Sequence, residues 1–160
     1  MSTNQKVLVV YYSHSGNTRT VGQAIAKALG ADVEEIVALD EKPGALQFIS
    51  RGLSATSGRA AAIMAPQKDP AQYDLVVVGG PVYGMTVSSP VRTYLDQQKA
   101  RFNRVAFFTT SMSHRYAATL DKMGEIAGKA PVGTLGVPGA ELRSGQYQEK
   151  VAAFCAELAR

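Results

Sequence analysis

The chain of 160 residues is 46% hydrophobic and 19% charged, which is typical of a single globular domain and excludes a disordered or collagen-like chain. Its 17 Lys and Arg residues outnumber 13 Asp and Glu residues, but no basic run occurs, so we expect no nucleic-acid partner. One cysteine and two separated histidines exclude a disulfide scaffold and a zinc domain, so we expect no bound metal.

Five segments rich in β-branched or aromatic residues are predicted to be strands: residues 6–12, 32–37, 75–79, 104–110 and 132–137. The first and third contain continuous apolar runs, which are typical of central strands that are buried on both faces. The second contains Glu34 and Glu35 and is therefore predicted to lie at an edge of the sheet.

Apolar residues at helical spacing predict helices between and after these strands. The first helix runs through residues 21–29 and ends at Gly30, a natural C-cap. A second is predicted over residues 45–53, followed by an irregular stretch over residues 55–72.

The third helix is predicted to begin with Ser89 as its N-cap and Pro90 as its first residue, where the missing N–H costs nothing. The fourth and fifth cover residues 120–127 and 147–158. Cys155 lies on the apolar side of the last helix, so we expect it to be a core residue and not a reactive one.

Strands that alternate with helices predict parallel pairing, right-handed crossovers and helices on both faces. The predicted fold class is therefore α/β: a three-layer, doubly wound sheet of five parallel strands in the order 2-1-3-4-5, with residues 1–160 forming one domain. In such a sheet ligands bind outside the carboxyl ends of the strands, where the winding reverses. For this order the binding crevice lies between the first and third strands.

A polar hexapeptide follows the first predicted strand and leads into the first helix: Ser13, His14, Ser15, Gly16, Asn17 and Thr18. Backbone N–H groups, side-chain hydroxyls and the positive end of the helix dipole together favour a bound phosphate. A simple turn that caps the helix is the alternative interpretation. Because neither an NTPase phosphate loop nor a dinucleotide fingerprint occurs, the phosphate of a mononucleotide is the better-matched ligand.

Residues 12–18 and the helix after them resemble the phosphate loop of flavodoxins and related flavoproteins, which has the pattern Ser/Thr-x-Ser/Thr-Gly-x-Thr. The resemblance extends to the second loop at residues 79–84, and the strand pattern covers essentially the whole chain. It implies FMN as the cofactor, bound at the switch point that this strand order creates. It also implies a role in electron transfer.

The second loop supplies five candidate cofactor-binding residues: Gly80, Pro81, Val82, Tyr83 and Gly84. Its glycines are expected to let the backbone approach a flat ring, and Tyr83 or Met85 is expected to stack on that ring. An ordinary half-buried surface tyrosine is the alternative interpretation of Tyr83.

The third loop corresponds, by position, to the one that lies along the other edge of the flavin in the family, and its candidate binding residues are Thr110, Ser111, Met112, Ser113 and Tyr116. Typical flavodoxins carry acidic residues here, whereas this chain has His114 and Arg115. A cation beside the reduced flavin would stabilise it by roughly 1 to 4 kcal/mol. His114 is a candidate proton donor, with the alternative that both side chains point into water.

Two functions remain open. One is an electron carrier that exchanges electrons with a redox partner protein; the other is an FMN-dependent oxidoreductase that uses NAD(P)H to reduce a quinone or another small acceptor. The short chain favours the carrier, and the basic third loop favours the reductase. A response-regulator receiver is excluded because Gly79 or Gly80 stands where it needs an Asp.

The chain contains no run of 18 apolar residues, and its first six residues are largely polar. We therefore expect no membrane span and a cytoplasmic location.

Overall fold

The computed structural model describes residues 5–39, 62–84 and 86–160. The helix predicted over residues 45–53, the part of the irregular stretch up to residue 61, and Met85 lie outside the described residues. Five parallel strands form the sheet: β1 (Val7–Tyr11), β2 (Asp32–Glu35), β3 (Leu75–Tyr83), β5 (Arg104–Ser111) and β6 (Thr134–Pro138).

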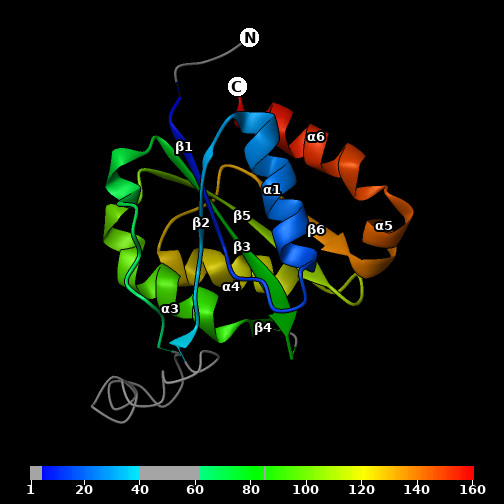
Figure 1. Ribbon diagram of the computed structural model, residues 1–160, viewed down its shortest axis with the longest axis horizontal. Helices are drawn as coiled ribbons and strands as arrows, with labels where there is room; N and C mark the ends of the chain where they lie inside the picture. Colours follow the sequence, from blue (N-terminus) through cyan, green and yellow to red (C-terminus); the bar gives the residue numbers. More distant parts are fainter. Residues whose placement is uncertain (1–4, 40–61, 85) are drawn as a thin grey trace.

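The strand order is β2-β1-β3-β5-β6, which confirms the predicted order of the five parallel strands (Figure 1). Every residue of β1 is buried, as are the first six residues of β3, because helices cover both faces at the centre of the sheet. In β2, by contrast, residues 32–35 are exposed or half-buried, as expected for an edge strand. A short strand that was not predicted, β4 (Thr86–Val87), pairs antiparallel with the end of β3.

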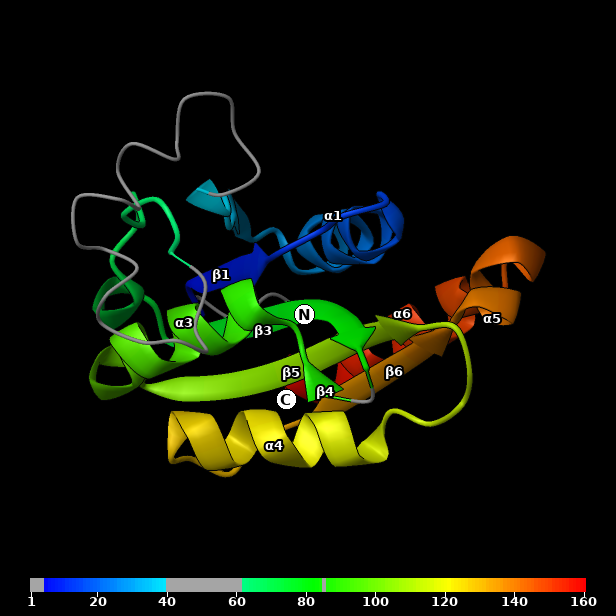
Figure 2. The same cartoon turned by 90° about the horizontal axis from the view of Figure 1, so that it is seen from below.

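The sheet lies between two helical layers, as Figure 2 shows for α1 and α4. One face packs against α1 (Asn17–Leu29) and α6 (Tyr147–Leu158). The other packs against α3 (Ser89–Gln98) and α4 (Ala117–Ala127). Three shorter helices complete the described chain: η3 (Pro70–Gln72), η4 (Lys99–Arg101) and α5 (Gly139–Ser144). No helix among the described residues has the length and apolar character needed to cross a membrane.

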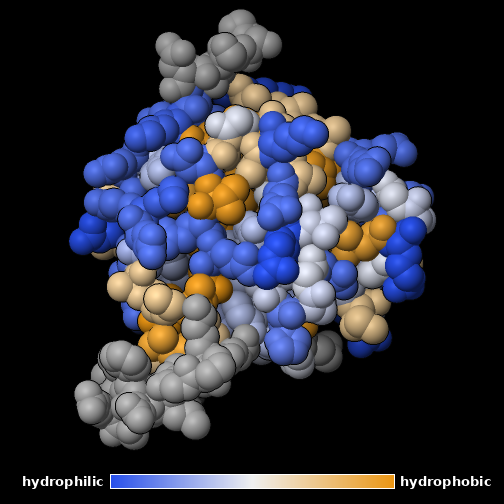
Figure 3. Space-filling model, in the orientation of Figure 1, coloured by the Kyte–Doolittle hydropathy of each residue, from blue (hydrophilic) through white to orange (hydrophobic). Residues whose placement is uncertain are grey.

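Helix α1 illustrates how the apolar spacing becomes structure. Val21 and Ile25 are buried against the sheet, while the outward face of the helix is hydrophilic (Figure 3). Gly30 ends the helix with φ +63°, a left-handed conformation that favours glycine, and so confirms the predicted C-cap.

Helix α3 starts one residue earlier than predicted. Ser88 is its N-cap and Ser89 its first residue, so Pro90 stands in the second position, where its missing N–H still has no intrahelical acceptor. In α6, Cys155 is buried, and burial raises the pKa of its thiol to about 11. The prediction that Cys155 is a core residue is therefore confirmed.

Candidate functional site

The three predicted loops meet at the carboxyl edge of the sheet. β1 and β3 are adjacent, with Tyr11 opposite Gly79, and β3 and β5 are adjacent, with Pro81 opposite Thr110. Because the chain passes from β1 to β2 on one side and later to β3 on the other, the winding reverses between β1 and β3. Residues 12–16 leave the sheet at this point.

The first loop is folded around the side chain of Ser13. Its Oγ accepts hydrogen bonds from the backbone N–H groups of Gly16 and Arg19, both at 3.1 Å. Gly16 has φ +104°, which an L side chain rarely adopts, and a Cβ there would meet nothing within 4 Å. The loop is thus preformed, and the space over Gly16 is open.

The remaining amides of this loop are available to a ligand. Within the described chain, the N–H groups of Ser15, Asn17 and Thr18 donate to no acceptor. Asn17 and Thr18 are the first two residues of α1, whose N–H groups have no intrahelical acceptor. The side chains of His14, Ser15 and Asn17 are exposed. The first turn of α1 contains no acidic residue, so its positive dipole end is uncompensated there. This donor set suits a phosphate.

Arg19 lies in the first turn of α1 but does not supply a free positive charge. Its Nε and Nη2 bind the carboxylate of Glu35 at 3.1 and 2.5 Å in a bidentate pair, and this pairing raises the pKa of Arg19. An anion bound by the first loop would therefore interact mainly with backbone amides. The sequence did not suggest this pair, because its partners lie on different elements.

A buried hydrogen bond connects the first and third loops. The hydroxyls of Thr18 and Thr110 are 2.7 Å apart, and both side chains are buried. Both residues were predicted to bind the cofactor, and the structure brings them together. Because two hydroxyls share one hydrogen bond, one of their protons is left for another acceptor.

The second loop differs from its prediction. Residues 80–83 continue β3, and the turn to β4 occurs at Gly84, which has φ +54°. The strand is longer than predicted because Gly80 and Pro81 pair with β5, while Val82 and Tyr83 pair with β4. Pro81 and Val82 are half-buried.

Tyr83 stands at the end of this hairpin with its side chain 39% exposed. Its ring makes edge-on contacts with Tyr12, at 6.4 Å between centroids, and with His14, at 6.5 Å. The structure thus places Tyr83 beside the first loop, as a shared site requires. Tyr12 was not among the predicted site residues, although its position directly after the first strand was a usable signal.

The glycines of the second loop have a packing role that was not predicted. A Cβ on Gly79 would overlap the ring of Phe108, and a Cβ on Gly80 would overlap the side chain of Val91. Packing thus gives these two glycines a reason of their own, whereas a Cβ on Gly84, the other glycine of the loop, would meet nothing within 4 Å. Whether the Gly80 backbone contacts a cofactor stays a prediction.

The third loop closes on itself. The Ser111 hydroxyl donates to the carbonyl of Ser113, and the Ser113 hydroxyl accepts from the N–H of Arg115 at 3.2 Å. Met112 at its tip is 93% exposed, and His114 and Arg115 are also exposed.

Tyr116, the last residue of this loop, packs against the protein. A Cβ on Gly136 would overlap its ring, and the amine of Lys150 lies 5.6 Å from the ring centroid. Its predicted role in binding a cofactor is not supported by these contacts and stays a prediction.

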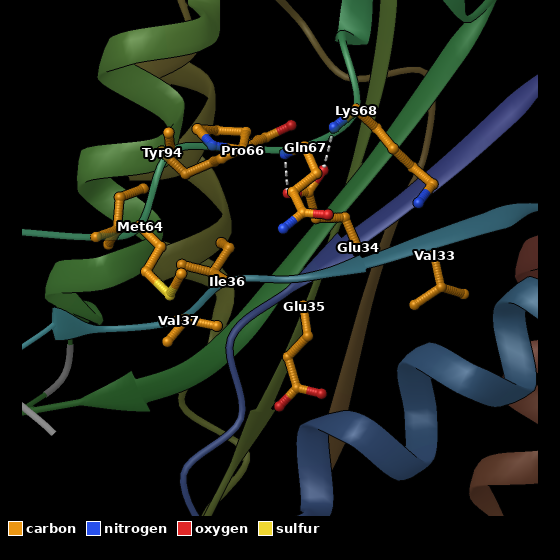
Figure 4. Close-up of a pocket in the computed structure, with 12 residues that line it drawn as sticks. Val33, Glu34, Glu35, Ile36, Val37, Met64, Pro66, Gln67, Lys68 and Tyr94 are labelled. Carbon is orange, nitrogen blue, oxygen red and sulfur yellow. Dashed lines mark hydrogen bonds between the residues drawn. The ribbon is translucent and has the colours of Figure 1, made fainter. Parts of the chain in front are cut away.

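A cavity of about 210 Å³ lies elsewhere, between the end of β2, residues 63–68 and Tyr94 of α3 (Figure 4). The carboxylate of Glu34 accepts from the N–H groups of Gln67 and Lys68 at 2.6 and 2.9 Å and holds this segment in place. Burial raises the pKa of Tyr94, whose hydroxyl has no hydrogen-bond partner among the described residues. The cavity lies beside the edge strand β2 and not at the switch point between β1 and β3, so we assign the candidate site to the loops.

The fold and site together define a doubly wound α/β protein with a loop of free backbone amides at its switch point, the arrangement that flavodoxin exemplifies. A sequence model of the flavodoxin family matches residues 6–135. The chain therefore belongs to the flavodoxin family.

Solved structures support this assignment. A flavoprotein from Lactobacillus acidophilus, solved in complex with FMN, is 25% identical with a TM-score of 0.67, and the match covers 88% of this chain and 97% of that one. A flavodoxin from Streptococcus pneumoniae is 14% identical with a TM-score of 0.61, covering 96% and 97%. Oxidised flavodoxin 1 from Bacillus cereus is 18% identical with a TM-score of 0.58, covering 95% of each chain. The last two show likeness of fold.

Proposed function

We propose that this protein binds FMN at the three loops and transfers electrons to or from a redox partner protein in the cytoplasm. The observation that carries the proposal is the set of free backbone amides at residues 15, 17 and 18, which lies where the flavodoxin fold binds its cofactor. Family membership and the FMN complex of the Lactobacillus acidophilus flavoprotein support it.

The residues present fit FMN. The N–H groups of Ser15, Asn17 and Thr18 would hold the phosphate, and the open space over Gly16 leaves room for its oxygens. The exposed ring of Tyr83 offers an apolar face for the flavin ring, next to the first loop. When bound, the flavin supplies the redox chemistry. The chain binds it, orients it and sets the charge around it.

The alternative function is an NAD(P)H:quinone oxidoreductase, and it depends on His114 and Arg115. Both side chains are exposed, and neither enters an ion pair within the described chain. His114 would have to approach the flavin to donate a proton to an acceptor. We therefore favour the carrier, and rapid oxidation of NADPH by the FMN-loaded protein with a quinone present would favour the reductase instead.

Replacing Gly16 tests the binding loop. Gly16→Val places a β-branched residue at φ +104°, which costs about 1–3 kcal/mol and forces the loop out of its preformed shape. We expect FMN affinity to fall by up to about 100-fold, since each 1.4 kcal/mol is about tenfold. The measurement is quenching of flavin fluorescence on titration with apo-protein.

Gly145→Val is the matched control. Gly145 has φ +88° with nothing within 4 Å of a Cβ, so the backbone strain is similar, but it lies between α5 and α6. Circular dichroism establishes that both variants fold. Wild-type affinity in a folded Gly16→Val variant would contradict the assignment of the phosphate loop.

A further inference from the structure

Two large apolar side chains are exposed at the carboxyl edge of the sheet, and together they define an apolar surface there. Met112 is 93% exposed at the tip of the third loop, and Tyr83 is 39% exposed at the end of β3. The strands that carry them are neighbours, since Pro81 pairs with Thr110. Methionine and tyrosine are enriched at the centres of protein interfaces, because they offer large contact areas that adapt to a partner.

Arginines surround this apolar surface. Arg92 donates to the Thr86 hydroxyl in the β3–β4 hairpin at 3.4 Å, and Arg115 follows Met112 in the third loop. A Cβ built on Gly139 would lie 3.3 Å from Nη1 of Arg143 and 3.7 Å from the carbonyl oxygen of Ser111. Arg143 therefore lies beside the start of the third loop. Arg143 was missed by the sequence analysis because it lies on α5, which was not predicted.

The carboxylates nearest to Arg92 and Arg143 in the sequence, Asp96 and Glu141, pair with the lysines Lys99 and Lys150. The segments 12–20, 80–92 and 109–118 contain no Asp or Glu. Within the part of the chain that the structure describes, Arg92, Arg115 and Arg143 make no ion pair, whereas Arg19 is paired with Glu35. The surface therefore presents uncompensated positive charge around an apolar centre.

We propose that this surface, formed by Met112 and by the part of Tyr83 that a bound flavin leaves exposed, and bordered by Arg92, Arg115 and Arg143, docks an acidic redox protein. The inference rests on the proposed function, because it places the partner at the edge where the flavin would be reached. Opposite charges would steer the partner and orient it, and a small apolar contact would allow rapid release after electron transfer. An interface of this kind is small and transient.

The test uses FMN-loaded protein labelled with ¹⁵N and two redox proteins as probes, an acidic plant-type ferredoxin and basic cytochrome c. At an ionic strength of about 0.02 M, we expect ferredoxin to shift the amide signals of residues 83–84 and 111–116, and at about 0.5 M we expect the shifts to vanish. Cytochrome c should leave these signals unchanged. Arg115→Glu should weaken the ferredoxin complex about tenfold at low salt.

Arg160→Glu is the control with the same change in charge, since Arg160 is exposed at the C-terminus, at the end of the molecule opposite β4 (Figure 1). We expect it to weaken binding much less than Arg115→Glu. Equal weakening by both variants, or equal shifts with cytochrome c, an anionic vesicle or a DNA duplex, would overturn the proposal.

FMN binding is measured on every variant before docking is tested. If the wild-type protein does not bind FMN, the proposed function fails. If it binds FMN and ferredoxin shifts no signal at this edge, the docking proposal alone fails.

Discussion

In the described part of the chain, the hydroxyl pair of Thr18 and Thr110 is the only side-chain hydrogen bond that joins the first and third loops, so it can be tested by itself. Thr110→Val keeps the shape of the side chain but leaves the buried Thr18 hydroxyl without its partner. We expect a loss of about 1–3 kcal/mol in the free energy of unfolding, together with weaker FMN binding. Urea denaturation of apo-protein measures the first, and flavin titration measures the second.

Thr109→Val is the control for this prediction, since Thr109 is the neighbouring residue and is equally buried. Its hydroxyl has no hydrogen-bond partner in the part of the chain that the structure describes, so removing it should be neutral or stabilising. Equal destabilisation by the two variants would mean that the Thr18–Thr110 bond contributes nothing specific.

For individual residues, a functional site can be predicted from the sequence where the residues that form it are neighbours in the chain. The loop at residues 13–18 could be recognised because its amides, hydroxyls and glycine are contiguous. The packing role of Gly79 and Gly80 could not be predicted in this way. The atoms that exclude a side chain there belong to Phe108 and Val91, which are distant in the sequence.

Between elements, Gly80 sets how closely β3 approaches α3. Gly80→Ala would place a methyl group against Val91 in a packed core, and we expect a loss of about 1–3 kcal/mol in unfolding free energy. Adding Val91→Ala removes the overlapping atoms. The double variant should therefore be more stable than the sum of the two single losses implies, which a double-mutant cycle in urea measures. Additive losses would show that the two residues do not interact.

The elements themselves were predictable to different degrees. Helix α1 and the core of β1 follow from apolar spacing and a glycine cap, which are local signals. The extension of β3 through residue 83 was missed because Gly80 and Pro81 read as a turn, whereas pairing with β5 holds them extended. Helix α5 has only six residues and no apolar repeat that predicts it.

For the whole molecule, the alternation of strands and helices was enough to predict the sheet order, because parallel pairing and right-handed crossovers leave few topologies. The arginines of the docking surface could not be grouped in the same way. Arg92, Arg115 and Arg143 come from three separate elements, and only the folded chain brings them to one edge.

Burial of Cys155 in the core makes the free energy of unfolding depend on pH. Its thiol is buried between α6 and α1, which raises its pKa from 9.0 to about 11. The unfolded chain loses this proton at lower pH than the folded chain, so stability should fall as pH rises from 9.0 towards 11, by up to about 3 kcal/mol. Cys155→Ala lacks this contribution, so its unfolding free energy should fall less between about pH 8 and about pH 10.5. Urea titrations of both proteins at these two pH values measure the difference, and identical losses would contradict the role assigned to burial of the thiol.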